Sequence, residues 1–447
     1  MRRGREWHEV TSKSLASRRF AGTEMSELDR RGCEMTGATP AAAELYERAL
    51  ATSLAWRNGA AELVDAALRE APAFVMAQVL KAWLLLAGRD VRRIGVGRPM
   101  LGTLARLPAN ARERLHVAAM RALIDDSYEG AKRMLGDLLQ RYPTDVLALQ
   151  IAHSLDYLTG DSSCLKSRVQ AVLPAWSPQT PGYDAVLAMH AFSLEENGDF
   201  VRAEREALEA LALNPKNARA HHVLAHVFEM TNRPDAGIRW MRDHEAAWAT
   251  DTIVAVHVWW HVALFHLALG RLGDALALYD DHIRANPSSE LSDLIDASAL
   301  LWRIDMLGGA AGTRWQELAE RWSARIDDAF CSFNDVHAML AFVGARDWQR
   351  ARRLDRVLSR SRWLPTRHGA TTRRVGLPAG RALIAFGRGN YARAVKLLTR
   401  LPAASQQLGG SHAQRDVLHL TLLRAIERTR REARPLPIKR AFTVAHA

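Results

Sequence analysis

Histidines recur at helical spacing in two short segments of the chain. HHVLAHVFEM contains His222 and His226, four residues apart, and Glu229 follows three residues later. HVWWHVALFH repeats the pair as His257 and His261. Residues four apart lie on the same face of an α-helix. Each segment is therefore expected to present two imidazoles in one direction.

Three kinds of chemistry suit these residue types. Four imidazoles with a nearby carboxylate can hold a transition metal such as Zn, Cu, Fe or Ni, so His222, His226, His257 and His261 are candidate metal ligands. A His–Glu or His–Asp pair can act as a general base, because the carboxylate fixes the tautomer. The same groups can also bind a small polar ligand. The zinc-protease motif HExxH is absent, since Val223 follows the first histidine.

A structural role is the competing interpretation of the same histidines. Helical repeats often bury polar side chains that bond to a neighbouring helix, and a buried imidazole can be satisfied by a carboxylate without any chemistry. Phe228, Trp259 and Trp260 are typical packing aromatics beside these histidines. Spacing alone does not separate packing from binding or catalysis, so all three interpretations stay open.

Repeated helix pairs are the elements that would position the histidines. Apolar helical segments alternate with turns at Gly160, Gly198, Asn232 and Gly270, which are 38, 34 and 38 residues apart. Two of the segments after a turn end in Asn-Pro, where proline stops a helix. Units of this length stack along one axis in solenoid proteins.

The distance between the two histidine pairs matches one such repeat. His222 precedes His257 by 35 residues, and His226 precedes His261 by the same number. Equivalent helices of successive repeats lie side by side. The two pairs are therefore expected to face each other on the concave side of the solenoid.

Other polar residues at comparable positions extend the expected groove. The groove candidates are His190, Glu195, His222, His226, Glu229, His257, His261, Asp335, His337, Ser411, His412, Gln414 and Arg415. The last four belong to the segment GGSHAQRD, which would complete the site if unequal repeats curl the solenoid until its ends approach. Ser411 is equally suited to cap a helix.

The predicted fold is all-α, an α-solenoid of tetratricopeptide-like (TPR-like) helix pairs in a right-handed superhelix. GDFVRAEREALEALALNP is similar to the second half of a tetratricopeptide repeat, and GNYARAVKLLTRLP repeats its pattern. The expected boundaries are a basic disordered tail at 1–35, the solenoid at 36–430 and a basic C-terminal tail at 431–447.

A set of sequence blocks resembles the tetratricopeptide repeat protein 38 family. These blocks, in that family's order from about residue 40 to 428, include RERLHVAAM, YPTDVLALQIAH, HVLAHVFEM, HVWWHVALFHL, LIDASALLWRIDMLGG, FNDVHAMLAF and LGGSHAQRDVLHLTLL. The resemblance implies a TPR-like helical solenoid. It implies no particular activity.

Composition narrows the setting and the partners. Three widely spaced cysteines among 447 residues favour reduced thiols and a cytoplasmic location. The sequence contains no uncharged apolar stretch long enough to cross a membrane, so no membrane span is predicted. The net charge of +12 comes largely from arginines near the two ends, which have few interleaved aromatics, so a nucleic-acid partner is disfavoured.

Two classes of function remain open at this level. The first is a scaffold or ligand-binding protein that holds a protein or peptide, or a small polar ligand, in its concave groove. The alternative is an enzyme or a metal-binding or small-molecule-binding protein with a His/Glu-lined pocket, and a transition metal is its possible cofactor. Whether the chain is an enzyme is left open. A deep pocket with strongly shifted imidazole pKa values would favour the second class.

Overall fold

Backbone conformation at the predicted turns explains why one helix stops and its partner begins. Gly160 and Asn232 both lie in the left-handed region, with φ of 70° and 52°. Glycine and asparagine reach that region at the least cost, so they end helices there. Gly198 and Gly270 also end helices with positive φ. All four predicted turns are confirmed.

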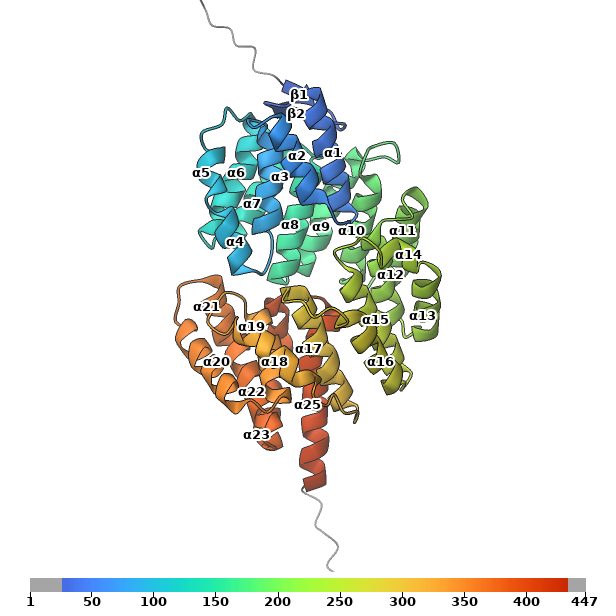
Figure 1. Cartoon of the computed structure of the whole chain (residues 1–447), viewed down its shortest axis with the longest axis vertical. Helices are drawn as coiled ribbons and strands as arrows, with labels where there is room; N and C mark the ends of the chain where they lie inside the picture. Colours follow the sequence, from blue (N-terminus) through green and yellow to red (C-terminus); the bar gives the residue numbers. More distant parts are fainter. Residues whose placement is uncertain (1–25, 433–447) are drawn as a thin grey trace, which may run out of the picture.

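The structure, a computed structural model, describes residues 26–432 (Figure 1). The first half contains two short strands, β1 (Ser26–Leu28) and β2 (Glu34–Thr36), and the helices α1 (Pro40–Leu54), α2 (Ala60–Glu70), α3 (Val75–Leu86), α4 (Val91–Gly97), α5 (Met100–Leu104), α6 (Ala111–Ile124), α7 (Tyr128–Arg141), α8 (Val146–Thr159), α9 (Ser162–Val172), α10 (Tyr183–Glu195) and α11 (Phe200–Leu213). The second half contains α12 (Ala218–Met230), α13 (Pro234–Asp243), α14 (Glu245–Trp248), α15 (Ala255–Ala268), α16 (Leu272–Leu278), α17 (Leu291–Met306), α18 (Arg314–Ser323), α19 (Ser332–Gly344), α20 (Trp348–Ser361), α21 (Arg367–Thr371), α22 (Leu377–Gly387), α23 (Tyr391–Leu398), α24 (Pro402–Ser405) and α25 (His412–Glu432).

Successive helices pair, and the first helices of successive pairs pack side by side. α8 pairs with α9, α10 with α11, α12 with α13 and α15 with α16. In the inner row α10 contacts α12, α12 contacts α15, and α15 contacts α17. Figure 1 places α11, α13 and α16 at the outer edge. The fold is therefore an all-α solenoid of tetratricopeptide type, as predicted.

The row of pairs curves until its two halves touch. Arg325 binds Asp90 at 2.9 Å, and Asn334 donates to the Arg89 carbonyl at 3.0 Å. The Tyr157 hydroxyl on α8 donates to the side chain of Gln414 on α25 at 2.7 Å. Figure 1 shows the same meeting, with α19 and α21 beneath α4. The solenoid is thus a closed ring rather than an open groove.

Two glycines permit the closest approach of backbones at this closure. A Cβ on Gly160, at the end of α8, would lie 1.8 Å from the Gln406 carbonyl oxygen. A Cβ on Gly409, just before α25, would lie 2.3 Å from the Leu158 carbonyl oxygen. No other residue type could occupy either position without moving the two segments apart.

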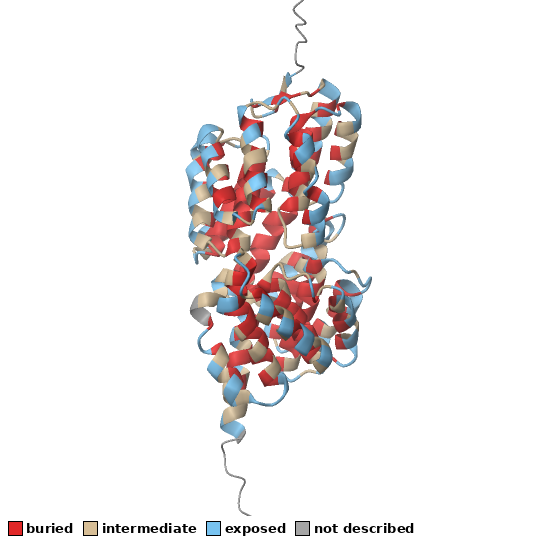
Figure 2. Ribbon diagram, turned by 90° about the vertical axis from the view of Figure 1, so that its left-hand side faces the viewer, coloured by how far each residue is buried: buried red, intermediate tan, exposed pale blue. Residues whose placement is uncertain are grey.

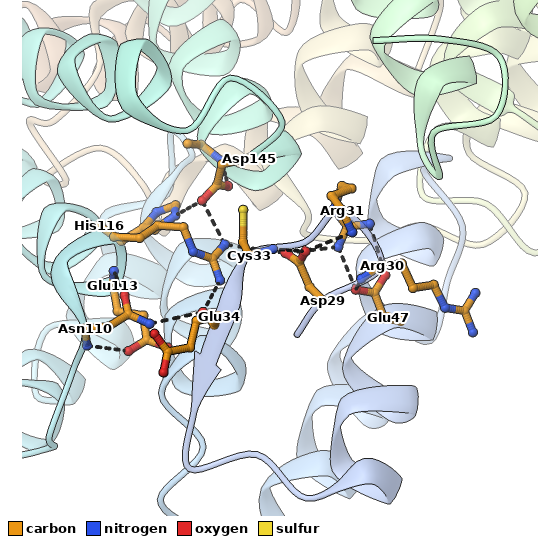
Figure 3. Close-up of polar contacts among 12 residues, drawn as sticks. Asp29, Arg30, Arg31, Cys33, Glu34, Glu47, Asn110, Glu113, His116 and Asp145 are labelled. Atoms are coloured by element: carbon orange, nitrogen blue, oxygen red, sulfur yellow. Dashed lines mark hydrogen bonds and ion pairs between the residues drawn. The ribbon is translucent and has the colours of Figure 1, made fainter. Parts of the chain in front are cut away.

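The described chain begins with a hairpin that was expected to be part of the tail. β1 and β2 pair antiparallel, with Ser26 opposite Thr36. Between them, Arg31 is buried and binds Glu47 of α1 at 2.6 Å (Figure 3). The expected tail at 1–35 is therefore ordered from residue 26, because buried ion pairs hold it. The rest of both expected tails, 1–25 and 433–447, lies outside the described residues.

Buried residues concentrate in the interior of both halves (Figure 2). One apolar cluster runs from Met35 to Met189, and a second runs from Leu165 to Ala425. Tyr183 packs against both clusters, so the core is continuous between the halves. Among residues 26–432, no helix is both long and apolar enough to cross a membrane.

Candidate functional site

The two histidine pairs meet, as the one-repeat spacing predicts. α12 supplies His222 and His226, and the neighbouring α15 supplies His257 and His261. One potential ligand atom from each lies within 4.8 Å of the other three. The ring centroids of His226 and His261 are 4.4 Å apart, and those of His222 and His257 are 4.9 Å apart. These four residues are called the histidine cluster below.

Carboxylates orient the two imidazoles of α15. The Nδ1 atom of His257 lies 2.8 Å from Oδ2 of Asp296 on α17. The Nδ1 atom of His261 lies 2.9 Å from Oε2 of Glu229 on α12. A carboxylate on Nδ1 holds the proton there and leaves the Nε2 lone pair free. This is the support that metal-ligating histidines usually have.

The remaining nitrogens of the cluster lack ordinary partners. Nε2 of His222 and Nε2 of His226 face each other at 3.0 Å. The Nδ1 atoms of both residues and Nε2 of His261 are buried without a hydrogen-bond partner. Buried polar atoms are rarely left unsatisfied in native proteins. Of these three atoms, Nε2 of His261 is the one that an ion shared with the Nε2 atoms of His222 and His226 would satisfy.

Burial keeps these imidazoles uncharged. The pKa values of His222, His226 and His261 are all well below the usual 6.5, first because burial penalises the imidazolium and then because the other imidazoles repel it. Neutral imidazole is the form that binds a metal ion. The cluster is therefore ready for a cation at neutral pH without first losing protons.

The spacing of the cluster suits a transition metal. Imidazole nitrogens bind zinc at about 2.0–2.1 Å, which places two ligands of a tetrahedral ion about 3.3 Å apart. The His222–His226 pair at 3.0 Å is already close to that distance. The wider pairs lie within 4.8 Å, so binding of a tetrahedral ion would require them to close by up to about 1.5 Å.

The histidine cluster borders a cavity of about 410 Å³ that is partly open to solvent. His222, His257 and Asp296 line it, whereas His226 and His261 are not among its lining residues. Aromatic side chains of Trp56, Tyr157 and Phe192, the guanidinium groups of Arg89, Arg93 and Arg219, and the amide of Gln414 complete much of the wall. A cavity of this size and mixed lining is typical of small-molecule sites.

Acidic residues lie behind the cluster, away from this cavity. Glu195 is fully buried, its Oε2 is 3.8 Å from Nδ1 of His226, and neither of its oxygens has a hydrogen-bond partner. Burial, then the nearby Glu196 and Glu229, raises its pKa well above the usual value. Burial also raises the pKa of Glu229 to about 7, although Arg303 opposes this. A cation at the cluster would favour the ionised form of both groups.

Of the four residues predicted in the GGSHAQRD segment, one reaches the cavity and three do not. Gln414 lines the cavity, as the curling of the solenoid requires. Ser411 instead caps α25, since its hydroxyl accepts from the Gln414 backbone N–H at 3.3 Å. His412 and Arg415 lie 3.5 and 3.6 Å from Glu196, outside the lining of this cavity.

Three other groove candidates point elsewhere. His190 bonds to Glu206 on the outer helix α11. Asp335 accepts from His368 at 2.9 Å, and His337 bonds to the Phe333 carbonyl oxygen at 2.8 Å. The structure does not bring these residues to the histidine cluster. Their sequence positions resemble those of the cluster, but side-chain direction differs with the rotation of each helix.

Sequence reasoning missed several polar residues of the site, among them Asp296, Arg219 and Arg89. Asp296 follows His257 by 39 residues, so extending the one-repeat rule by one helix pair would have found it. Arg219 lies about one turn before His222, and its charge within an apolar helix was a signal. Arg89 lies between two short helices, and nothing in its local sequence points to the site.

Comparison with known proteins places repeats at the centre of the chain. The tetratricopeptide repeat model matches residues 189–252 and 254–290, which include the whole histidine cluster.

Several solved structures match most of the chain at low similarity. Yeast Tom70 is 10% identical, with 85% of this chain and 87% of that chain covered and a TM-score of 0.42. The human IFIT1 dimer with m7Gppp-AAAA is 12% identical, with 87% and 86% covered and a TM-score of 0.40. The APC/C hetero-tetramer Cut9–Hcn1 is 14% identical, with 85% and 76% covered and a TM-score of 0.37. The chain therefore contains tetratricopeptide-type repeats at its centre, with further helix pairs on either side.

Proposed function

We propose that this protein binds one divalent transition-metal ion at the histidine cluster and a small molecule in the adjoining cavity. The observation that carries the proposal is the convergence of four imidazoles within 4.8 Å. Carboxylates hold two of these rings, and Nε2 of His261 has no hydrogen-bond partner. Imidazole-rich sites suit Zn, Cu, Fe or Ni. A bound ion would supply a Lewis acid beside the cavity.

The metal content of the purified full-length protein tests this proposal. After treatment with a chelator, the protein is titrated with Co²⁺ and followed by visible absorption, and elemental analysis gives the stoichiometry. One ion per chain is expected. His222→Ala and His261→Ala should each weaken binding by about 100-fold or more, since each removes a ligand.

His221→Ala is the matched control. His221 is buried next to His222, but its nitrogens face the Pro215 carbonyl oxygen at 3.0 Å and the Trp240 indole N–H at 3.4 Å. This variant should keep the ion. Absence of stoichiometric metal in the wild type, or an equal loss in His221→Ala, would contradict the proposal.

A scaffold that binds a protein or peptide is the second candidate function. The repeat match over residues 189–252 and 254–290 supports it, because tetratricopeptide-type repeats commonly present concave binding surfaces. Closure of the ring leaves a cavity of about 410 Å³ in place of a continuous groove. A helix with its side chains is about 10 Å across, so a cavity of this volume would hold only about one helical turn. The cavity therefore suits a small ligand better than a peptide helix.

Hydrogen exchange separates the two candidates. A peptide partner would protect amides over a broad surface of several helix pairs. A small ligand would protect only the segments around the cavity, in α12, α15 and the loop before α4.

We also propose membership of the tetratricopeptide repeat protein 38 family and a cytoplasmic location. The order of the resembling blocks from about residue 40 to 428 supports the first. The cysteines support the second, since Cys33, Cys164 and Cys331 are all unpaired. Imaging of the tagged full-length protein tests the location.

A further inference from the structure

Two arginines of the cavity carry charge that no described acidic side chain neutralises directly. Arg89 and Arg219 line the same space as His222 and His257. We propose that the small molecule is an organic anion, whose carboxylate or phosphate group binds these two arginines and whose apolar part contacts the cavity's aromatic side chains. This inference rests on the proposed function in so far as the cavity is a ligand site.

Arg89 is held in place by aromatic rings rather than by an acid. Its guanidinium carbon lies 4.1 Å from the centroid of the Phe333 ring and 5.3 Å from that of Tyr157. Its Nε and Nη2 atoms are buried and have no hydrogen-bond partner. Guanidinium donors match the two oxygens of a carboxylate or phosphate. An anion in the cavity would neutralise the charge of this guanidinium.

Arg219 is buried deeper and is similarly short of partners. It lies on the Trp56 ring at 4.3 Å, and its Nε donates to the Leu54 carbonyl oxygen at 3.4 Å. Burial lowers its pKa to about 9, opposed only by the charge of Asp184. A buried cation is costly unless an opposite charge accompanies it. A bound anion would provide that charge.

The acidic residues of the cavity are already engaged with other groups. Asp90 binds Arg325 at 2.9 Å, and Glu290 binds Arg93 at 3.0 Å. Asp296 accepts from His257 at 2.8 Å. None of the three is paired with Arg89 or Arg219. Arg89 and Arg219 therefore contribute two positive charges against one carboxylate, Asp296, that no arginine pairs with, so the balance is positive by one charge before any metal ion is added.

Many of the other lining residues are apolar, so they favour an anion whose remaining part is apolar too. Trp56, Phe192, Leu84, Ile253 and Val254 all border the cavity. Inorganic anions would leave these surfaces without contacts. An organic acid with an aromatic or aliphatic body fills the cavity and covers them.

Pairs of charged and neutral probes test the inference on the full-length protein. Benzoate and phenyl phosphate are titrated calorimetrically against benzamide and benzyl alcohol, with the metal-stripped and the Co²⁺-loaded protein. At least one anion should bind about tenfold or more tightly than its neutral counterpart, because charge-assisted hydrogen bonds are worth about 1.5–3 kcal/mol. The better of the two anions identifies the head group.

Substitutions then locate the anion. Arg89→Met and Arg219→Met should each remove most of the preference for the anion, whereas Arg93→Met should keep it. Arg93 lines the same cavity and carries the same charge, but its side chain is 54% exposed and is paired with Glu290. Circular dichroism and cobalt content verify that each variant is folded.

The outcomes separate this inference from the metal proposal. Equal binding of benzoate and benzamide by the wild type, or no binding of either anion below 1 mM, would overturn the inference whatever the metal content. An equal loss in Arg93→Met would also overturn it, because a general charge effect would then suffice. Anion preference without stoichiometric metal would support the inference and contradict the metal proposal.

Discussion

Two buried sites in this protein contain histidine and differ in the partners of its ring nitrogens. In the amino-terminal network, formed by Asp29, Arg31, Glu47, Arg112, His116 and Asp145, both ring nitrogens of His116 are bonded. Its Nδ1 accepts from the Trp83 indole N–H at 3.1 Å, and its Nε2 lies 3.1 Å from Asp145 (Figure 3). In the histidine cluster, three ring nitrogens have no partner.

The two sites also differ in the charges that surround their titratable groups. Burial alone would raise the pKa of Asp145, but the adjacent His116 and Arg112 hold it below its usual value. Positive and negative groups therefore alternate in the amino-terminal network. In the histidine cluster the four imidazoles face one another, and their neighbours disfavour protonation. A satisfied network stabilises the fold, whereas an unsatisfied one is suited to bind a ligand.

Stability should distinguish the two regions most clearly. Arg112→Met leaves Asp145 buried without its guanidinium partner at 3.0 Å, so the free energy of unfolding should fall by about 3–5 kcal/mol. His226→Leu in the metal-free protein replaces a neutral ring with a side chain of similar size. It should change the free energy of unfolding by less than about 1.5 kcal/mol. Urea denaturation of both variants measures the difference.

In a measurement of metal binding, the order of the two effects should be reversed. Arg112→Met should keep the ion under native conditions, and His226→Leu should lose it. If His226→Leu destabilises the metal-free protein as strongly as Arg112→Met, the histidine cluster is a structural network like the first, and the comparison fails.

Substitution of a carboxylate that supports a histidine should have an effect of intermediate size, and it tests the same comparison between the two kinds of site. Asp296→Asn weakens the hold on His257, so metal affinity should fall by about 10–100-fold. Asp335→Asn changes an equivalent His–carboxylate pair, with His368 at 2.9 Å, that lies outside the cluster. Competition with a chromophoric chelator should show no change in affinity for this second variant. Equal effects would mean that both substitutions act through general stability.

The pH dependence of metal affinity is the smallest expected effect. The imidazoles of His222, His226 and His261 stay neutral well below pH 6.5, so they release few protons when the ion binds. Glu229, whose pKa is raised to about 7, is protonated below that pH and ionises when His261 holds a cation. Affinity should therefore be constant above pH 7 and fall by about tenfold per unit below it.

Glu229→Gln removes this proton from the titration. The amide oxygen still accepts from His261, but the side chain no longer titrates, so the dependence of affinity on pH should become shallower between pH 6 and 8, with Glu195 as the remaining carboxyl of raised pKa. Calorimetry in buffers of different ionisation enthalpy counts the protons directly. Release of three or more protons per ion in the wild type would show that the imidazoles keep ordinary pKa values in the folded protein.

The sequence by itself determined the repeat and what the repeat brings together. Turn residues such as Gly160 and Asn232 end helices for local steric reasons, and apolar periodicity fixes the inner face of each helix. Neighbouring helices one repeat apart must then touch. The meeting of His222 with His257 follows from these local rules.

Tertiary structure alone decided the ring and the chemistry of its cavity. Closure depends on the sum of many small rotations between helix pairs, and no single segment encodes that sum. It brings Arg89, from the loop before α4, into the same cavity as Asp296 and Gln414. It also turns His190 and His337 away from the histidine cluster, although both occupy repeat positions like those of its members. Side-chain direction within a repeat depends on the packing of each helix against its neighbours, which the periodicity of the sequence does not specify.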